Sequence, residues 1–385
     1  MTVLLLNYEY PPLGGGAANA TLFMAKALVK LGHRAVVVTS ALGRASGRTE
    51  ENNIVVYHLR TGRVLRDRST VYEVGRYLLA SLIHAPDIAT KEGCQGTIAF
   101  FTLPSAWPAR KLLRKHGLPY VISLAGGDVP GHVPELERLH ALTKPWRRAA
   151  LRDARGIVAN SEGLAATCRV ADPFPVAIIP NGVDNDLFHP AEDLDSRERS
   201  VLKLLFVGRV HREKNLGVVF EQLATLPKAA RERYRLMVVG DGAQRSELVA
   251  RAEQLGLTAQ IDWLGWQEKD AMPALYRRAD AFVIPSLYEG MSNAALEAMA
   301  SGLPVFASDV PGNRAVVTED ETGALFPLDR PEKLGAALEK FALDREWGRN
   351  LGKAARRRTE SDLSWEKTAQ QYLEFLRPIS VPNTD

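Results

Sequence analysis

The sequence has little that would anchor it in a membrane, cross-link it or load it with metal. Its 385 residues contain only two cysteines, Cys94 and Cys168, which lie far apart and indicate reduced thiols in a cytoplasmic protein. No apolar run approaches the length that spans a bilayer, and the first residues lack the basic region of a signal peptide. The eight histidines form no ligand cluster. These absences argue against an integral membrane protein and a disulfide scaffold, and they leave no convincing metal site.

Aromatic residues are also scarce, at 7% of the chain, and they are not interleaved with basic residues as a nucleic-acid platform requires. The formal charge of +4 conceals an asymmetry. Residues 1–180 contain 22 Lys and Arg against 13 Asp and Glu, whereas residues 181–385 contain 27 against 32. The basic excess forms either ordinary solvated helix faces or a surface that attracts anionic lipid or a phosphorylated acceptor. A nucleic-acid partner is not predicted.

Short apolar segments alternate with helical patterns along the chain, which is typical of α/β proteins with doubly wound parallel sheets. The length and the number of segments predict two such domains, 1–180 and 181–364, on either side of a cleft. A charged linker or surface loop is expected at 191–200, and a last helix at Trp365–Leu376. The expected strands are Val3–Leu6, Ala35–Thr39, Ile54–Tyr57, Thr97–Phe101, Tyr120–Ser123, Gly156–Ala159, Lys203–Val207, Leu236–Val239, Ala281–Ile284 and Pro304–Ala307.

The most informative motif is Glu289-Gly-Met-Ser-Asn-Ala-Ala-Leu-Glu297, which follows the expected strand Ala281–Ile284. Ser292 or Asn293 is expected to cap a helix that ends near Gly302. The N–H groups at the start of that helix favour an anion such as phosphate. Glutamates at this spacing are often solvated helix surface, but here small apolar residues surround the second one. A carboxylate on each side of a phosphate site suits the hydroxyls of a sugar and of a ribose.

A second motif, Gly14-Gly15-Gly16, separates the first strand from a helix expected at about Ala20–Leu31. The glycines form either a tight structural turn or a close backbone approach to a phosphate. The spacing differs from a dinucleotide-binding fingerprint, and Thr39 and Ser40 stand where an acidic residue would read a ribose.

Two cations, Arg209 and Lys214, lie on the loop after the first strand of the second half. The guanidinium of Arg209 can make bidentate contacts to phosphate oxygens, and Lys214 can act as a point charge. Because this loop leaves the same sheet as Glu289, a diphosphate clamp is favoured over a merely solvated loop.

Together these motifs resemble the retaining glycosyltransferases of family 4, whose signature is two glutamates separated by seven residues. Val207-Gly-Arg-Val with Lys214, Pro180-Asn-Gly-Val-Asp, Val239-Gly-Asp-Gly, Leu264-Gly and Gly14-Gly-Gly stand in the order that the family shows. The resemblance implies a GT-B fold with two Rossmann-like domains. It implies an N-terminal acceptor domain, 1–180, a C-terminal donor domain, 181–364, and a last segment, about 365–385, that crosses back to the first domain.

The resemblance also implies roles for individual residues. Glu297 would hold the ribose and Glu289 the donor sugar, while Arg209 and Lys214 would neutralise the leaving diphosphate. Backbone amides near Gly290, Met291 and Asn293 would meet phosphate, and Gly15 and Gly16 would face it from the first domain. Such enzymes are usually metal-independent and need no cofactor beyond the nucleotide sugar.

The acceptor side departs from the family pattern. Many relatives carry a histidine where this chain has Ala125, within Ala125-Gly-Gly-Asp128. Asp128 and His132 are expected to orient the acceptor or accept a proton, and Asn19 to lie beside the acceptor. We expect front-face attack that is assisted mainly by the departing phosphate.

The sequence therefore predicts a cytoplasmic retaining glycosyltransferase, peripheral at the membrane through its basic first domain, that uses a nucleotide sugar to build polysaccharide or glycolipid. Two alternatives stay open, a sugar-nucleotide epimerase of the same fold and a catalytically silent nucleotide-sugar binding protein. Uracil, guanine and adenine are not ranked by the sequence, and neither the sugar nor the acceptor is identified.

Overall fold

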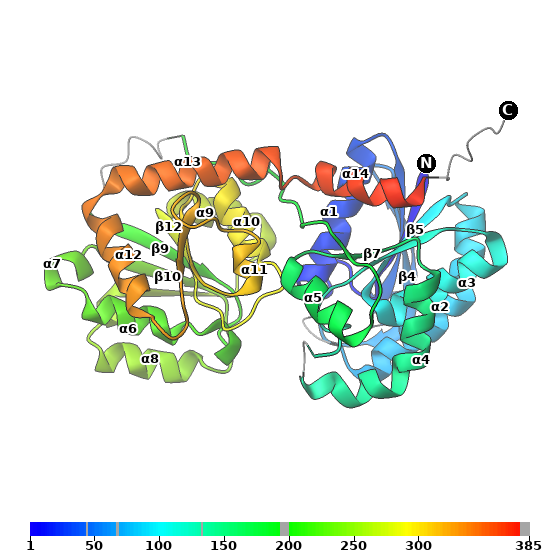
Figure 1. The fold of residues 1–385 in the computed structure, drawn as a ribbon, viewed down its shortest axis with the longest axis horizontal. Coiled ribbons are helices and arrows are strands. Elements are labelled where there is room, and N and C mark those ends of the chain that lie inside the picture. Colours follow the sequence, from blue (N-terminus) through cyan, green and yellow to red (C-terminus); the bar gives the residue numbers. More distant parts are fainter. Residues whose placement is uncertain (44, 67–68, 132–133, 193–199, 378–385) are drawn as a thin grey trace. The chain divides into compact units, whose positions relative to one another are not determined.

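The chain folds into two compact units in a computed structural model that describes residues 1–43, 45–66, 69–131, 134–192 and 200–377. The units divide between Asn181 and Gly182 and again between Ser364 and Trp365. Unit 1 contains residues 1–181 and the helix α14 (Trp365–Leu376), and unit 2 contains residues 182–364 (Figure 1). His132 and residues 193–199 of the expected linker lie outside the described residues. No helix of the described chain is long and apolar enough to cross a membrane.

Unit 1 is built on one sheet with the strand order β3-β4-β2-β1-β5-β6-β7-β8. All neighbouring strands are parallel except β3 and β4, which form an antiparallel hairpin at the edge. The strands are β1 (Thr2–Leu6), β2 (Arg34–Leu42), β3 (Gly47–Glu51), β4 (Ile54–Arg63), β5 (Gly96–Phe100), β6 (Tyr120–Ser123), β7 (Gly156–Ala159) and β8 (Ala177–Ile178).

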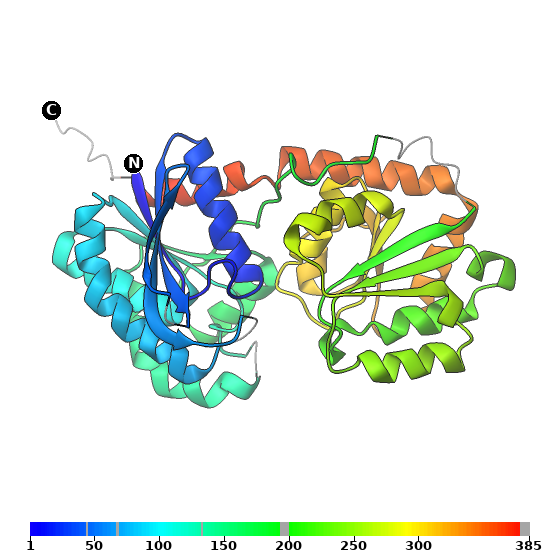
Figure 2. The same cartoon turned by 180° about the vertical axis from the view of Figure 1, so that it is seen from behind.

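Alternate side chains of the strands reach opposite faces of this sheet, and helices cover both faces. Leu4 and Leu6 of β1 pack in the core beneath α2, α3, α4 and α5, whereas Val3 and Leu5 pack beneath α1 and α14. The two helices of the second face lie side by side (Figures 1 and 2). The helices of unit 1 other than α14 are α1 (Gly16–Lys30), α2 (Val71–Lys91), α3 (Ala106–His116), α4 (Glu137–Asp153) and α5 (Glu162–Ala171).

Helix α14 is an integral part of unit 1, although it is the last helix of the chain. The ring of Trp365 stacks on Phe23 of α1 with centroids 5.9 Å apart, and Tyr372 Oη donates to Ser123 Oγ over 2.9 Å. A Cβ on Gly156 of β7 would lie 2.4 Å from the ring of Phe375. The absent side chain at Gly156 therefore lets α14 lie directly on the strand.

Unit 2 contains a parallel sheet with the strand order β11-β10-β9-β12-β13-β14. Its two faces carry separate apolar clusters, one with α6, α8 and α12 and the other with α9, α10 and α13. Its strands are β9 (Leu202–Val207), β10 (Tyr234–Val239), β11 (Ile261–Gly265), β12 (Ala281–Ile284), β13 (Val305–Ser308) and β14 (Gly323–Phe326). Its helices are α6 (Gly217–Thr225), α7 (Lys228–Arg231), α8 (Arg245–Gln254), α9 (Met272–Arg278), α10 (Asn293–Ala300), α11 (Pro311–Arg314), α12 (Glu332–Leu343) and α13 (Arg345–Ser361).

The predicted fold class, two doubly wound α/β sheets, is confirmed, and so is the existence of all ten expected strands. Four further strands, β3, β8, β11 and β14, were not expected because they lack a buried apolar run. The fully exposed β3 depends on a hairpin turn in which Asn52 and Asn53 have φ of 50° and 62°. Strand β14 begins at Gly323, whose missing side chain admits the backbone of β13.

We predict that Gly323→Ala destabilises unit 2, because the new Cβ would lie 1.9 Å from the carbonyl oxygen of Val305. The expected loss is about 1–3 kcal/mol, typical of overpacking against neighbours that have no room to move. Urea unfolding followed by tryptophan fluorescence measures it. Gly75→Ala is the matched control, since it lies inside α2 with nothing near its Cβ and is expected to be neutral or slightly stabilising. Equal losses in both variants would contradict the prediction.

Candidate functional site

The strand order of unit 2 reverses between β9 and β12, and the predicted donor-site residues cluster there. From β9 the chain winds outward through β10 and β11, then returns to the other side of β9 with β12 and continues to β13 and β14. The loops that leave β9 and β12 therefore diverge and leave room for a ligand at the carboxyl edge of the sheet. A backbone hydrogen bond joins the two loops, from Leu287 N to Glu213 O at 2.8 Å.

Lys214 and Glu289 meet at this point. Lys214 Nζ lies 2.5 Å from Glu289 Oε1, and Ser286 Oγ donates to the same oxygen over 2.8 Å. Both side chains of the pair are half-buried, with exposed fractions of 21% and 12%. Two motifs 75 residues apart in the sequence thus form one charged pair. The cation can bind an anion and the carboxylate can accept hydrogen bonds from hydroxyls.

Arg209 lies on the same loop but is far more accessible. Its side chain is 72% exposed, and its Nη2 lies 3.1 Å from Glu213 Oε1. An exposed ion pair of this kind contributes little to stability, so its guanidinium can turn to an incoming anion at small cost. The structure brings Arg209 and Lys214 to one loop, as predicted, and gives each cation an acidic partner.

Glycines hold this loop in place through direct backbone packing. Gly240, just after β10, has φ of +125°, and a Cβ there would lie 2.0 Å from the carbonyl oxygen of Gly208. A Cβ on Gly242 would lie 2.4 Å from the carbonyl oxygen of Val210. The Gly240-Asp-Gly242 segment is therefore more than a turn, because it packs directly against the backbone of the loop that carries Arg209.

A support behind Glu289 was not predicted from the sequence. A Cβ on Gly312 of α11 would lie 2.1 Å from the carbonyl oxygen of Glu289. Asn313 Nδ2 donates to the carbonyl oxygen of Ser308 over 2.9 Å, and Ser308 Oγ in turn donates to the carbonyl oxygen of Ser286 over 2.5 Å. The signal that could have revealed this support is the Pro311-Gly-Asn sequence that begins α11, three residues after β13 ends at Ser308.

Glu297 lies in the helix that follows Glu289. Ser292 caps α10, as predicted, by accepting a hydrogen bond from Ala295 N over 3.2 Å. The predicted phosphate-binding positions Gly290, Met291 and Asn293 therefore surround the positive end of this helix. One and a half turns further, the carboxyl of Glu297 is only partly open to solvent.

The environment of Glu297 perturbs its acidity. Desolvation raises the pKa of Glu297 to about 7, although the hydrogen bond from Tyr276 and the charge of Lys269 oppose the rise. Because this pKa lies above the ordinary value, the side chain favours the folded state at low pH, and that contribution is lost as the pH rises through 7. A desolvated carboxyl with a shifted pKa is typical of a binding site, and this one can accept hydrogen bonds from a ligand.

Tyr276 is a site residue that sequence reasoning missed. Its side chain is fully buried, and its hydroxyl donates to Glu297 Oε2 over 2.8 Å. Burial and the nearby Glu297 raise the pKa of Tyr276 well above its usual range, so the hydroxyl stays a donor. The phenol thereby fixes one carboxyl oxygen of Glu297 and leaves the other for a ligand.

In unit 1 the glycine motif starts a helix, but earlier than predicted. Helix α1 begins at Gly16 with Gly15 as its cap, not at about Ala20, because the glycines themselves adopt the helical start. Asn19 lies in the first turn, where its N–H donates to Gly15 O over 3.1 Å. Gly15 and Gly16 thus lie at the start of a helix, where free N–H groups favour an anion.

The glycine loop rests on an unpredicted ion pair. The guanidinium of Arg63, only 1% exposed, lies 3.3 Å from Glu9 Oε1 and also donates to the carbonyl oxygens of Leu65 and Arg66. Gly14 has φ of +84°, and a Cβ there would lie 2.5 Å from Glu9 Oε2. The pair joins residues 54 positions apart, which no local pattern indicates.

Asp128 lies in the loop after β6, as predicted, and its carboxylate is largely buried. Its side chain is 6% exposed, and its two oxygens accept hydrogen bonds from Thr102 N at 2.7 Å, Thr102 Oγ1 at 3.0 Å and Ala125 N at 3.0 Å. These bonds tie the loop after β6 to the turn after β5. The geometry therefore supports loop positioning by Asp128, and its role toward an acceptor stays a prediction. His132, predicted beside it, lies outside the described residues.

Within the described chain no group of three or more His, Cys, Asp or Glu side chains is placed to hold a metal ion. Both cysteines are unpaired thiols, and burial raises the pKa of Cys94 and Cys168 to about 12. Metal independence stays a prediction.

Comparison with known proteins gives two adjoining family matches. The family model described as "Glycosyltransferase Family 4" matches residues 14–187, and the one described as "Glycosyl transferases group 1" matches residues 195–358. A D-inositol 3-phosphate glycosyltransferase of Rhodococcus erythropolis is 30% identical over 275 residues, which cover 68% of this chain. The matched region spans only 60% of that relative's length.

Solved structures share the fold of the whole chain. A sucrose-phosphate synthase from Thermosynechococcus elongatus has a TM-score of 0.80 at 23% identity and covers 97% of both chains. The Anabaena protein HepE, solved with UDP and with UDP-glucose, has a TM-score of 0.75 at 19% identity in the UDP complex, with 98% of this chain and 99% of that chain covered. The chain belongs to glycosyltransferase family 4 and has the GT-B fold.

Proposed function

We propose that the protein transfers a sugar from a nucleoside diphosphate sugar to a hydroxyl acceptor with retention of configuration. The observation that carries the proposal is the contact between Lys214 and Glu289 at the strand-order reversal, with Glu297 in the next helix. In such a donor, Glu289 would match the sugar, Lys214 beside the helix start would match the diphosphate, and Glu297 would match the ribose. The proposal assigns donor binding to unit 2 and acceptor binding to unit 1.

The proposed reaction breaks the bond between the sugar C1 and the diphosphate oxygen, and the electron pair leaves with the phosphate. The acceptor oxygen forms a new bond to C1 on the same face, and its proton passes to the departing phosphate oxygen. Lys214, Arg209 and the start of α10 stabilise the developing negative charge. This chemistry proceeds without a metal ion in the proposal, because protein cations and helix N–H groups supply the counter-charge.

Individual roles follow from the contacts. Glu289 would accept hydrogen bonds from sugar hydroxyls through its Oε2, since Lys214 and Ser286 both contact its Oε1. Glu297 would accept from the ribose, held in orientation by Tyr276. Asp128 would position the loop that carries Ala125, and Asn19 would lie near the acceptor. With Asp128 occupied, the leaving phosphate is the proposed proton acceptor.

The two alternatives predict different products. An epimerase would release a free epimerised sugar and would require acid and base side chains around the sugar. A silent binding protein would bind nucleotide and release nothing. The intact set of Glu289, Glu297, Arg209 and Lys214 favours the transferase. Release of nucleoside diphosphate that depends on an added acceptor distinguishes it from both alternatives.

The outer surface of unit 1 supports membrane contact during polysaccharide or glycolipid assembly. Helices α2 and α4 cover the same face of the sheet, and each exposes apolar side chains, among them Leu79 and Ile83 of α2 and Leu142 and Trp146 of α4. Arg76 lies in the same helix face as Leu79 and Ile83. Exposed apolar residues beside cations suit the surface of an anionic membrane.

We predict that UDP, GDP or ADP raises the melting temperature of the protein and that Lys214→Met weakens the response. UDP is tested first because a fold neighbour binds it. Loss of one charge-assisted contact to a diphosphate is expected to lower the affinity about 10- to 100-fold. Arg212→Gln is the matched control, as it removes an exposed cation from the same loop. If no nucleoside diphosphate stabilises the parent chain, the donor-site assignment fails.

We also predict that nucleotide affinity falls about tenfold between pH 8 and pH 6, because the pKa of Glu297 is about 7 and only the ionised carboxylate accepts two ribose hydroxyls. Isothermal titration calorimetry of UDP at several pH values measures this. In Glu297→Gln the phosphate still titrates but residue 297 does not, so the slope should be shallower. Identical slopes in the two proteins would refute the ribose role.

For the membrane surface, we predict that Leu79→Glu with Ile83→Glu abolishes co-sedimentation with vesicles that contain phosphatidylglycerol. Both positions are more than 60% exposed, so the changes leave the core intact. Val170→Glu, at an exposed apolar residue outside α2 and α4, is the control and should leave sedimentation unchanged. Parent protein that stays in the supernatant would rule out this partner.

A further inference from the structure

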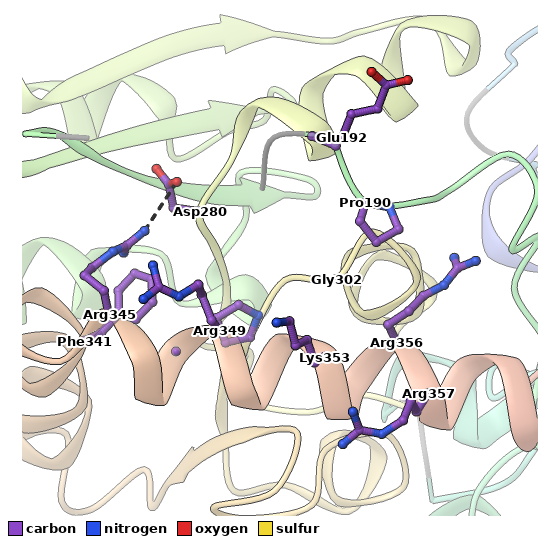
Figure 3. A pocket seen from close by; sticks show the side chains of 13 residues that line it. Pro190, Glu192, Asp280, Gly302, Phe341, Arg345, Arg349, Lys353, Arg356 and Arg357 are labelled. Atoms are coloured by element: carbon purple, nitrogen blue, oxygen red, sulfur yellow. Dashed lines mark ion pairs between the residues drawn. The ribbon is translucent and has the colours of Figure 1, made fainter. Parts of the chain in front are cut away.

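A cavity of about 300 Å³ lies within unit 2 at the amino edge of its sheet (Figure 3). Asp280 and Pro304, which line it, directly precede β12 and β13, and Gly302 follows α10. Helix α13 forms the opposite wall. The loops with Arg209, Lys214 and Glu289 leave the carboxyl ends of the same strands. The cavity is therefore separate from the proposed donor site.

Helix α13 turns a row of cations toward this cavity. Arg345, Arg349 and Lys353 recur at every fourth position and extend from the same side of the helix (Figure 3). Arg357, four positions further, also lines the cavity, but its side chain extends from the other side of the helix in the same view. A Cβ on Gly352 would lie 2.1 Å from the carbonyl oxygen of Gly302. This close contact seats the helix against the cavity and fixes the position of the row.

Arg345 carries a hydrogen-bond donor that nothing in the described residues satisfies. Its Nη1 is buried and has no hydrogen-bond partner, while its Nη2 lies 3.5 Å from Asp280 Oδ1. The other oxygen of Asp280 accepts from Lys203 N over 2.8 Å. A buried donor without a partner costs about 1–3 kcal/mol, so a ligand that accepts from it would gain that energy.

Arg356 and Arg349, which also line the cavity, differ in their contacts. Arg356 stabilises the fold, because its Nη1 donates to the carbonyl oxygens of Asn185, Phe188 and Ala300. Arg349, in contrast, makes no ion pair or hydrogen bond with the described residues and borders the cavity. The only other acid among the lining residues is Glu192, whose carboxylate points away from α13 in Figure 3.

We propose that this cavity binds a phosphoryl group, held by Arg345, Arg349 and Lys353. A guanidinium presents paired N–H donors that match phosphate oxygens, and the buried Nη1 of Arg345 would supply one of them. The cavity volume suits a phosphorylated small molecule and is at the small end for ligand sites. The site is independent of the proposed transferase chemistry.

Isothermal titration calorimetry of the full chain with inorganic phosphate tests the proposal, in the presence of saturating nucleoside diphosphate to occupy the donor site. We expect binding in the parent chain and a loss of about tenfold or more in affinity for Arg349→Gln with Lys353→Gln. Lys333→Gln is the matched control, since it removes an exposed cation of α12 that does not line the cavity, and it should bind like the parent. Arg345→Gln is avoided, because it would leave Asp280 without its cation.

Three outcomes overturn the proposal: no phosphate binding by the parent, equal binding by the double variant, or an equal loss in Lys333→Gln. Nucleotide stabilisation with no phosphate binding would leave the transferase assignment standing and remove this site alone. The phosphoryl group belongs either to a lipid headgroup or to a free phosphorylated molecule. Co-sedimentation with vesicles of phosphatidylglycerol in phosphatidylcholine distinguishes these two sources. If the double variant also loses co-sedimentation, the ligand is a lipid headgroup; if only phosphate binding falls, it is a free phosphorylated molecule.

Discussion

The adjacency of β9 and β12 is the constraint on which the candidate site depends. Two parallel strands that neighbour each other but lie far apart in the sequence bring their following loops to one edge of the sheet. The loop after β9 carries cations, and the loop after β12 carries an acid. Their meeting in the Lys214–Glu289 pair is thus a result of topology. A different strand order would leave the same residues with no common ligand.

The two cations of the candidate site each form an ion pair with an acidic side chain. Lys214 is matched by Glu289 and Arg209 by Glu213, so neither cation is left uncompensated. The half-buried charge of Lys214 would destabilise the protein if it had no partner. In the proposed function, a diphosphate would compete for these cations, and sugar hydroxyls would compete for the released carboxylate. The pairing would therefore favour a ligand that offers both groups at once over free phosphate, which offers only one.

Much of the fold and part of the site could be predicted from local sequence. Apolar runs such as Ala281–Ile284 identify buried strands, and Ser292 identifies a helix start, because both effects act within a few residues. The Arg63–Glu9 pair and the hydrogen bond from Tyr276 to Glu297 depend on tertiary packing and have no local signal. The motif around Asp128 predicts a role toward the acceptor, but it does not indicate that the carboxylate is largely buried and bonded to Thr102 and Ala125.

The position of α14 has a consequence for synthesis of the chain. Since unit 1 takes its last helix from beyond residue 364, unit 2 is an insertion within unit 1. During translation the core face formed by α1 and the sheet, including Phe23 and Gly156, stays uncovered until all of Gly182–Ser364 has left the ribosome. Unit 2 is continuous in sequence, so it can fold before α14 has been synthesised, whereas unit 1 is complete only afterwards. A truncation before Trp365 would remove α14 and leave every strand of unit 1 in place. It would therefore expose the apolar face of the sheet and of α1 that α14 covers.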